Sequence, residues 1–249
     1  MSSTSSVPAV LLVGGMGTRL RSVVPSTPKP LAAVGVKPFL ELLVRQLRNQ
    51  GIRRLIMCSG YLAGEIENKF GDGSEWDVAI EYSREPQPLG TAGAIKHAES
   101  HLTEDSTFLV MNGDSFLEID FAQLIHAHRA HNALATMAIV AVENAARYGT
   151  VRVDSCARIM GFAEKTGMDI PGLINAGVYV FNRSIFTDIP QGTSSLEREV
   201  FPRVLDHAVY ALECSGMFID IGTPEDYARA QNLYEQLNDR CVARVMESQ

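Results

Sequence analysis

Short apolar segments and amphipathic segments alternate along the first half of the chain. The apolar segments contain β-branched residues, as buried strands do: residues 9–13, 55–58, 78–82 and 108–111. Between them, apolar positions recur at the spacing of a helix: residues 39–50, 62–70, 91–102 and 121–131. Strands and helices that alternate in this way predict βαβ units and a mainly parallel sheet.

The pattern changes after Ala133. Four strand-like segments follow with few helical stretches between them: residues 136–142, 150–153, 159–162 and 177–181. They predict an antiparallel or mixed addition to the sheet. The last third predicts a helix over 195–206, strands over 209–212 and 217–221, and a helix over 224–237. Thr223 as cap, Pro224 at the first helical position and Asp226 three residues after the cap mark the start of that last helix.

The 249 residues contain no internal repeat, low-complexity linker or charge block, and they are enough to bury a core without disulfides or metal staples. We expect a flexible tail at residues 1–6 and a single domain over residues 7–240, with halves at about 7–131 and 132–240. The predicted fold class is α/β. It is a Rossmann-like, mixed but mainly parallel sheet flanked by helices, with a smaller antiparallel portion.

Composition and charge narrow the classes of partner and compartment. A hydrophobic content of 46% and a charged content of 20% are typical of a soluble globular chain. The net charge of −7 would repel DNA, so we expect no nucleic-acid partner and a phosphate ligand held by local cations. Residues 133–142, the longest apolar run, are about half as long as a membrane-spanning helix. The N-terminus lacks the charged start of a secretion signal, which predicts a cytoplasmic protein.

The spacing of the cysteines and histidines does not indicate a metal site or a disulfide. The four cysteines have no paired spacing, which favours a reduced compartment: Cys58, Cys156, Cys214 and Cys241. His126, His128 and His131 are spaced so that they do not all share one helix face. We therefore expect these histidines on a solvated helix face and no zinc site.

A glycine-rich loop follows the first predicted strand and carries the strongest chemical signal. It has the sequence Leu12-Val13-Gly14-Gly15-Met16-Gly17-Thr18-Arg19-Leu20, and Pro28-Lys29-Pro30 follows it. Closely spaced glycines allow a sharp turn and leave amide N–H groups free for phosphate oxygens. Arg19 offers a fork of donors and Lys29 a compact positive charge. A plain strand-to-helix turn would need neither, so the loop predicts a di- or triphosphate site.

Two known phosphate motifs do not fit this loop. The P-loop ends in Gly-Lys-Ser/Thr, which does not occur after Gly14. The dinucleotide fingerprint matches Gly15 and Gly17 but meets Leu20 where a small residue is required, and its acidic ribose partner is missing. An NAD-dependent oxidoreductase is therefore disfavoured.

The loop resembles the signature of the sugar-phosphate nucleotidyltransferases, Leu-Ala-Gly-Gly-x-Gly-Thr-Arg-Leu followed after a spacer by Pro-Lys-Pro. Val13 stands where the family usually has Ala, and Arg21-Ser22 stands where many members have Pro. Further motifs match in order along nearly the whole chain: Pro88-Leu89-Gly90-Thr91-Ala92-Gly93-Ala94, Asn112-Gly113-Asp114, Glu164-Lys165, Asn175-Ala176-Gly177 and Asp220-Ile221-Gly222-Thr223-Pro224. So many motifs in the same order make a chance similarity improbable.

The resemblance implies a nucleoside triphosphate in the first half of the domain and a sugar 1-phosphate in the second. It implies these nucleotide contacts: Leu12, Gly14, Gly15, Gly17, Thr18, Arg19, Lys29, Gly60, Gly90, Thr91 and Asp114. It implies these sugar-phosphate contacts: Gly113, Glu164, Lys165, Asn175 and Gly177. The small residues from Gly90 to Gly93 are expected to let a flat base approach closely.

The resemblance also implies a Mg²⁺ ion held by Asp114 and Asp220. Asp114 follows the predicted strand over 108–111, at the end of a strand where open α/β sheets bind ligands. Asp220 again ends a short apolar strand. Mg²⁺ commonly takes one or two carboxylates together with phosphate oxygens. The sequence does not show that the two acids converge, and the resemblance implies that they do.

The implied reaction is attack by a sugar 1-phosphate oxygen on the α-phosphorus of the triphosphate, with release of pyrophosphate. Both reactants are anionic, so neutralisation and alignment are the expected work of the protein. The expected catalytic residues are Arg19 at the pyrophosphate, Lys29 at the α-phosphate, Lys165 at the attacking phosphate and Asp114 through the metal ion.

Residues 19–24, 37–41 and 59–61 are most similar to D-glycero-D-manno-heptose 1-phosphate guanylyltransferases, which make GDP-heptose for surface polysaccharide. GTP and a heptose 1-phosphate are therefore the favoured substrates, and a uridylyl- or thymidylyltransferase acting on a hexose 1-phosphate is the alternative. A non-catalytic nucleotide-sugar-binding regulator would be expected to lose some of the cations or carboxylates, which are all present. A homodimer through Phe39-Leu40 and apolar edge strands is also considered.

Overall fold

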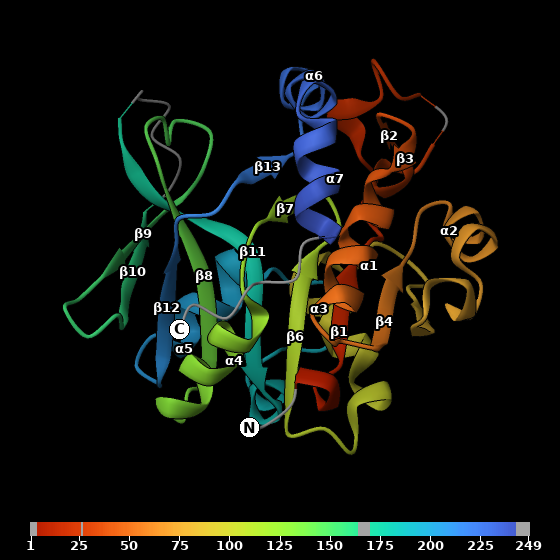
Figure 1. The fold of residues 1–249 in the computed structure, drawn as a ribbon. Helices are drawn as coiled ribbons and strands as arrows, with labels where there is room; N and C mark the ends of the chain where they lie inside the picture. Colours follow the sequence, from red (N-terminus) through yellow and green to blue (C-terminus); the bar gives the residue numbers. More distant parts are fainter. Residues whose placement is uncertain (1–3, 26, 164–169, 243–249) are drawn as a thin grey trace.

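The computed structural model describes residues 4–25, 27–163 and 170–242. Figure 1 shows its strands: β1 Ala9–Leu12, β2 Ala33–Val34, β3 Lys37–Pro38, β4 Arg54–Ser59, β5 Ala79–Arg84, β6 Thr107–Asn112, β7 Ser115–Leu117, β8 Ala135–Val142, β9 Thr150–Val153, β10 Ile159–Ala163, β11 Gly172–Asn182, β12 Val209–Cys214 and β13 Phe218–Asp220. The α-helices are α1 Phe39–Asn49, α2 Ala63–Phe70, α3 Gly90–His97, α4 Phe121–Ala130, α5 Phe201–Val204, α6 Pro224–Asn232 and α7 Tyr234–Val242.

Nine strands of the described residues form the main sheet. Its order is β10-β9-β11-β6-β1-β4-β5, and β8 pairs with β11 and with β12. β1 is parallel to β4 and β6, and β4 is parallel to β5, whereas β11 is antiparallel to β6, β8 and β9. Leu12 pairs with Cys58 of β4 and with Asn112 of β6. The loops after β1, β4 and β6 therefore start from one edge of the sheet, where α/β proteins bind ligands.

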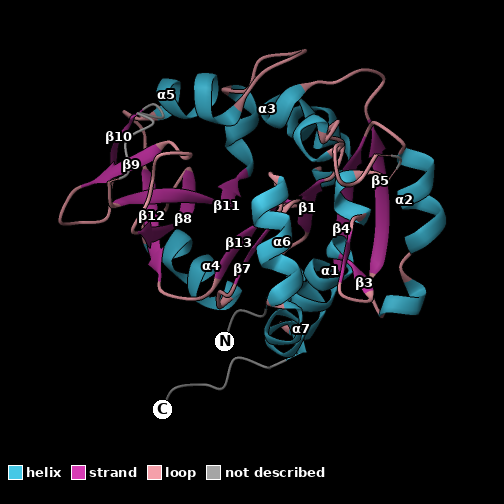
Figure 2. Cartoon of the chain, turned by 90° about the horizontal axis from the view of Figure 1, so that it is seen from above, coloured by secondary structure: helices cyan, strands magenta, loops and turns pink. Residues whose placement is uncertain are grey.

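Two apolar cores lie on the two faces of this sheet. Successive side chains of β1 point to opposite faces, so Leu11 packs in the core that includes α1, α2 and α4, and Val10 packs in the core that includes α3 and α5. Figure 2 shows α3 and α5 on one side of the sheet and α1, α4 and α7 on the other. This arrangement confirms the predicted α/β class with a mixed, mainly parallel sheet.

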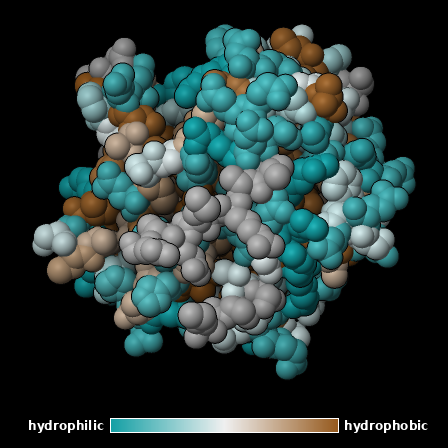
Figure 3. Space-filling view, in the orientation of Figure 1, coloured by the Kyte–Doolittle hydropathy of each residue, from teal (hydrophilic) through white to brown (hydrophobic). Residues whose placement is uncertain are grey.

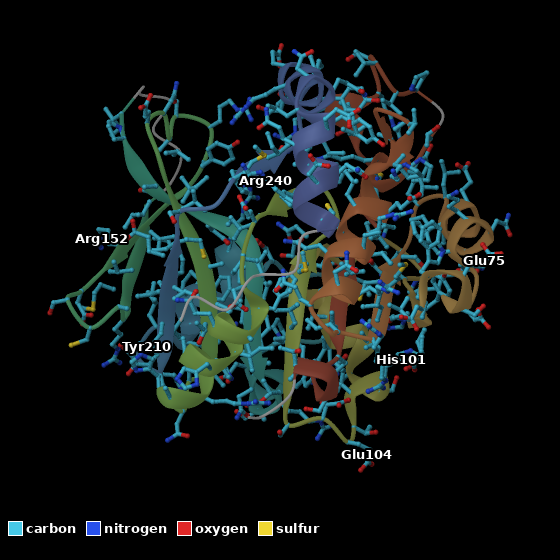
Figure 4. All side chains as sticks on the ribbon, viewed as in Figure 1. Glu75, His101, Glu104, Arg152, Tyr210 and Arg240 are labelled. Carbon is cyan, nitrogen blue, oxygen red and sulfur yellow. The ribbon has the colours of Figure 1, made fainter. Side chains whose placement is uncertain are left out.

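A second, two-stranded sheet carries part of the candidate site. β7 and β13 pair antiparallel, and the Glu118 N–H that follows β7 donates to Met217 O at 2.9 Å. Arg240 of α7, labelled in Figure 4, forms an ion pair with the Glu118 carboxylate. The β7–β13 pair is thus fixed to the C-terminal helix.

Several predicted elements differ from the observed ones. The helix predicted over 195–206 is a π-helical turn, Leu196–Val200, followed by α5. The helix predicted over 224–237 is divided at Leu233 into α6 and α7. The pattern did not predict β2, β3 or β7. The start of α6 is confirmed, because the Thr223 hydroxyl accepts a hydrogen bond from the Asp226 N–H.

The pair Phe39-Leu40, one part of the dimer contact considered above, does not reach the surface. Phe39 and Leu40 are fully buried in the core, so the prediction that they contact a second subunit is wrong. The surface drawn in Figure 3 is mostly hydrophilic over α6 and α7. Across the described ranges, every helix is too short or too polar to cross a membrane.

Candidate active site

The glycine-rich loop leaves β1 in close contact with the loop after β4. The Val13 N–H donates to Cys58 O at 3.0 Å, and the Tyr61 N–H donates to Gly14 O at 3.4 Å. A Cβ at Gly14 would lie 2.5 Å from Glu85 Oε1 and 3.1 Å from Gly60 N, so a side chain there would displace the Glu85 carboxylate and crowd the loop after β4. Glycine at this position lets the three loops approach one another closely.

Gly15 and Met16 form an exposed part of the loop. A Cβ at Gly15 would meet no atom within 4 Å, and the backbone N–H groups of residues 14–17 find no acceptor among the described residues. One 3-10 turn, Thr18–Leu20, follows and buries Leu20 while Arg19 stays exposed. Arg19 forms no ion pair within the part of the chain that the structure describes. Free amides and an unpaired guanidinium can bind an incoming anion.

Lys29 links this loop to the first acid. It begins a 3-10 turn, Lys29–Leu31, and its side chain is only 9% exposed. The Nζ atom lies 2.5 Å from Asp114 Oδ2. A Cβ at Gly222 would lie 3.4 Å from the same nitrogen. The ammonium therefore sits between the segment after β6 and the segment after β13.

The structure brings Asp114 and Asp220 together. Asp114 lies between β6 and β7, and Asp220 ends β13 opposite Ser115 of β7. The Ile221 N–H donates to Asp114 O at 3.0 Å. This hydrogen bond extends the β7–β13 pairing one residue beyond the pair of Asp220 and Ser115. Two acids 106 positions apart in the sequence, 220 − 114, thus share one site because of the β7–β13 pairing.

The buried carboxyl of Asp220 lies close to more negative than positive side chains. Burial raises the pKa of its carboxyl above the usual value, and the negative charge of Asp114 raises it further. Lys29 and the Gly222 N–H oppose this shift, and the N–H donates a short hydrogen bond to Asp220 Oδ1. One ammonium therefore serves two carboxylates at this point.

These residues fit a Mg²⁺ ion that is shared with a ligand. Two carboxylates can each give one oxygen, and phosphate oxygens and water complete the usual six positions. Among the described residues, no group of three or more His, Cys, Asp or Glu side chains could hold a metal by itself. One or two carboxylates together with substrate phosphates are a usual set of Mg²⁺ ligands in proteins.

The other predicted residues at this edge occupy consistent positions. Leu12 is the last residue of β1, Gly60 follows β4, and Gly113 follows β6 with its N–H donating to Leu12 O at 2.9 Å. Glu164 and Lys165, expected at the sugar phosphate, lie outside the described residues.

Asn175 and Gly177 lie at a bulge in β11. The pairing of β11 with β8 shifts register between Asn175 and Tyr179. Gly177 has φ +75°, and a Cβ there would lie 2.5 Å from Asn112 Nδ2. The Gly177 N–H donates to Asn175 Oδ1 at 2.9 Å. The two residues predicted to contact the sugar therefore shape this strand beside the end of β6.

The glycines at the start of α3 pack against the segment before the π-helical turn. A Cβ at Gly90 would lie 2.5 Å from Ser194 O, and one at Gly93 would lie 2.3 Å from Gly192 O. The backbone of residues 192–194 therefore fills the space on the Cβ side of both glycines, and a side chain at either position would push α3 away from this segment. Thr91 donates its hydroxyl to Glu197 Oε2 at 3.1 Å.

Glu85 is a candidate that sequence reasoning missed. It follows β5, and its N–H donates to Ser59 O at 2.8 Å, so it joins the loops at the same sheet edge. Its Oε2 accepts the Leu89 N–H at 2.9 Å, while Oε1 faces Gly14. Burial raises the pKa of its carboxyl. The strand over 78–82 was predicted, and the rule that ligands bind beyond strand ends could have indicated Glu85.

Arg147 and Tyr148, in the loop before β9, were also missed. Arg147 donates to Thr223 Oγ1 at 3.3 Å and forms an ion pair with Asp226 of α6. Tyr148 lies edge-on to Phe218 of β13, with ring centroids 6.1 Å apart. Burial and the charge of Asp220 raise the pKa of Tyr148. These contacts close the β8–β9 loop over the strand that carries Asp220, and no local sequence pattern signals them.

Comparisons with known proteins agree with this geometry. Residues 8–237 match the family described as Nucleotidyl transferase. The chain is 41% identical over 231 residues to a mannose-1-phosphate guanylyltransferase of Mycobacterium tuberculosis; the match covers 91% of this chain and 64% of that relative. The chain thus spans less than two thirds of that relative's length.

Two further proteins match over nearly their whole length. The chain is 39% identical to a D-glycero-alpha-D-manno-heptose 1-phosphate guanylyltransferase of Aneurinibacillus thermoaerophilus, a match that covers 90% of this chain and 96% of the relative. The crystal structure of HddC from Yersinia pseudotuberculosis in complex with GMP-PN matches with a TM-score of 0.83 and 34% identity, covering 92% of this chain and 99% of that chain. The chain belongs to the nucleotidyl transferase family.

Proposed function

We propose that the protein transfers GMP from GTP to a sugar 1-phosphate and releases pyrophosphate. The observation that carries this proposal is the meeting of Lys29, Asp114 and Asp220 at the sheet edge from which the glycine-rich loop starts. The named relatives at 41% and 39% identity are both guanylyltransferases. A site with exposed amides, cations and two acids suits a reaction between two anionic phosphates.

The reaction forms one bond and breaks one. An oxygen of the sugar phosphate attacks the α-phosphorus, and the bond from this phosphorus to the bridging oxygen breaks, so pyrophosphate leaves with the electron pair. Arg19 and the loop amides bind the leaving phosphates, and Lys29 neutralises charge at the α-phosphate. Lys165 is the proposed partner of the attacking phosphate.

Asp114 and Asp220 are the proposed holders of a Mg²⁺ ion. When bound, the ion supplies positive charge to the phosphate oxygens at the place where two carboxylates now share one ammonium. The two carboxylates would determine where the ion binds, because the β7–β13 pairing fixes both of them relative to Lys29.

Glu85 supports guanine as the base. An ionised carboxylate only accepts hydrogen bonds, and guanine presents adjacent N–H and NH₂ donors on its Watson–Crick edge. Uracil and thymine present one N–H between two carbonyl oxygens, and a carboxylate repels these oxygens. Glu85 Oε1 is directed towards Gly14 of the proposed phosphate loop, and its second oxygen is already bound to the Leu89 N–H.

We propose a D-glycero-D-manno-heptose 1-phosphate as the sugar substrate. The heptose relative is matched over 96% of its own length, whereas the mannose relative is matched over 64%. Mannose 1-phosphate is the second candidate, because the relative at 41% identity carries that name. The product would be a cytoplasmic GDP-sugar that supplies surface polysaccharide synthesis.

Pyrophosphate release with a panel of substrates tests this function. GTP, UTP, dTTP, CTP and ATP are each combined with heptose, mannose and glucose 1-phosphates in the presence of Mg²⁺. We expect the highest kcat/KM for GTP with the heptose. Faster release with UTP or dTTP and glucose 1-phosphate would refute the guanylyl proposal, and no release with any pair would refute the reaction itself.

The variant Glu85→Gln tests the base assignment separately. A glutamine can donate as well as accept, so we expect kcat/KM for GTP to fall about 10- to 100-fold while the ratio of UTP to GTP use rises. Glu81→Gln is the matched control, because Glu81 lies on β5, the strand that Glu85 follows, but bonds Arg54 and His101. An unchanged base preference in Glu85→Gln would show that Glu85 does not contact the base.

A further inference from the structure

A continuous chain of polar side chains links α3 to the bulge in β11. Thr91 and Ser195 donate their hydroxyls to Glu197 Oε2 at 3.1 and 2.9 Å. The Tyr179 hydroxyl donates to Glu197 Oε1 at 3.4 Å and accepts from Asn175 Nδ2 at 2.7 Å. The Glu197 carboxylate therefore joins the proposed nucleotide side of the site to the proposed sugar side.

The direction of each hydrogen bond in this chain is fixed by Glu197. An ionised carboxylate has no hydrogen to give, so the Tyr179 hydroxyl must direct its hydrogen towards Glu197. The tyrosine oxygen can then only accept, and it accepts from the NH₂ group of Asn175. At the other end, the Gly177 N–H requires the Asn175 oxygen. The orientation of the Asn175 amide is thus determined from both sides.

The surroundings of this chain make its orientation rigid. Tyr179 is fully buried, packed against Phe181 and Phe201 with centroids 5.7 and 5.4 Å away. Glu197 is held in the π-helical turn Leu196–Val200, a type of turn frequent at functional sites. Within the described part of the chain, Glu197 forms no ion pair, and three hydroxyl groups donate to its half-buried carboxylate.

We propose that Glu197 is a positioning residue for sugar recognition, which acts through Tyr179 to hold the Asn175 amide in one orientation. This inference rests on the proposed function, because it concerns the sugar side of that site. With glutamine at 197, an NH₂ group can donate to the Tyr179 oxygen. The tyrosine hydrogen is then free to turn towards Asn175, and only the Gly177 N–H still fixes the orientation of the amide.

Steady-state kinetics of three variants and one double variant test the proposal. Glu197→Gln and Tyr179→Phe both interrupt the chain, and Glu197→Gln with Tyr179→Phe interrupts it twice. Glu199→Gln is the matched control, since Glu199 lies in the same turn and its carboxylate bonds the Ser195 N–H instead. Melting temperatures of all variants show whether each one folds.

We expect the KM for the sugar 1-phosphate to rise about tenfold in Glu197→Gln and in Tyr179→Phe, with the KM for GTP changed less than twofold. The double variant should be no worse than either single variant, because both act on the same hydrogen bond. Glu199→Gln should keep the wild-type KM values. A role limited to stability would lower the melting temperature and leave this split between substrates absent.

Three results would overturn the proposal. They are an unchanged sugar KM in both single variants, an equal rise in the KM values of both substrates, or multiplicative effects in the double variant. Should Glu197→Gln fail to fold, Tyr179→Phe decides, because it removes only one oxygen atom. Failure of the wild type to form any nucleotide sugar would instead refute the proposed function, so the two ideas can fail separately.

Discussion

At the scale of single residues, Lys29 is the cation that the two acids of the site share. Its ammonium touches Asp114, and its positive charge opposes the rise that burial and Asp114 cause in the pKa of the Asp220 carboxyl. A divalent ion held by these acids has to compete with it. The change Lys29→Met should therefore strengthen Mn²⁺ binding in the absence of nucleotide.

The same change should reduce kcat by about 100- to 1,000-fold, because a charge that stabilises the transition state is removed. Electron paramagnetic resonance of free Mn²⁺ measures the binding, and Lys37→Met is the control, since Lys37 bonds Tyr234 and Asn238 far along the chain. Weaker Mn²⁺ binding in Lys29→Met would contradict this view of the acids as metal ligands.

Arg19 should act on the leaving group and hardly on the sugar. The exposed guanidinium follows the phosphate loop, so Arg19→Ala is expected to lower turnover far more than it weakens binding of the sugar 1-phosphate. Arg21→Ala removes the same charge two residues later, where the guanidinium lies over the Tyr61 ring, and should lower turnover less. Wild-type turnover in Arg19→Ala would refute the assignment, and calorimetry gives the sugar affinity.

His128 shows a residue-scale effect that the sequence did not reveal. The helical spacing predicted a solvated face, which holds for His126 and His131 but is wrong for His128. Its imidazole is buried, and Nδ1 lies 3.1 Å from Thr136 Oγ1. The neighbour that covers it comes from β8, so only the tertiary fold decides its burial.

Burial lowers the pKa of His128 to about 4. An unfolded histidine titrates near 6.5, so the unfolded chain binds more protons between about pH 6.5 and 4. The free energy of unfolding therefore has its full value above pH 6.5 and decreases as the pH falls towards and through 4, by up to about 3 kcal/mol in total. Urea unfolding at pH 7 and 4.5 should show a smaller loss in His128→Gln; an equal loss would assign the effect to other groups.

At the scale of elements, the bulge in β11 depends on Gly177. Its φ of +75° and the nearness of Asn112 both oppose a side chain. We expect Gly177→Ala to lower the free energy of unfolding by about 1 to 3 kcal/mol. Gly15→Ala is the control for stability, because a Cβ there meets no atom within 4 Å. Equal denaturation midpoints for the two variants would contradict this reading of the bulge.

Periodicity predicted those elements whose pattern is local, and it missed those set by tertiary contacts. The strands that become β1, β4 and β6 contain continuous apolar runs, and the run in β5 is interrupted only by Glu81 before Tyr82, so their hydrophobic pattern is sufficient to locate them. The helix over 224–237 has neither glycine nor proline after Pro224, yet it breaks at Leu233. The break lets the Tyr234 hydroxyl accept from Lys37 Nζ at 3.1 Å, a contact with the unpredicted β3.

The residues of the candidate site that belong to local motifs were predicted, and those defined by tertiary contacts were missed. Motif resemblance named Lys29, Asp114 and Asp220, and the rule for strand ends gave their edge of the sheet. The contact between β7 and β13 that brings the acids together was invisible, because β7 is a three-residue strand. Glu85 and Glu197 were missed because their roles depend on partners far away in the sequence.

At the scale of the whole molecule, one sheet connects the two halves of the domain. β11 pairs antiparallel with β6, so the strand that carries Asn175 and Gly177 is fixed beside the strand that precedes Asp114. On a chain with a net charge of −7, the few cations at this edge are what can attract two anionic reactants. We therefore expect both reactants to meet at the sheet edge formed by the carboxyl ends of β1, β4 and β6, between the glycine-rich loop and the paired acids.

Crystals grown with Mn²⁺ and a non-hydrolysable GTP analogue test this claim most directly. Anomalous diffraction locates the metal without assumptions about its ligands. We expect one Mn²⁺ peak between the carboxylates of Asp114 and Asp220, with the triphosphate along residues 14–19. A nucleotide bound elsewhere, or a metal peak that touches neither acid, would contradict the assignment of this site.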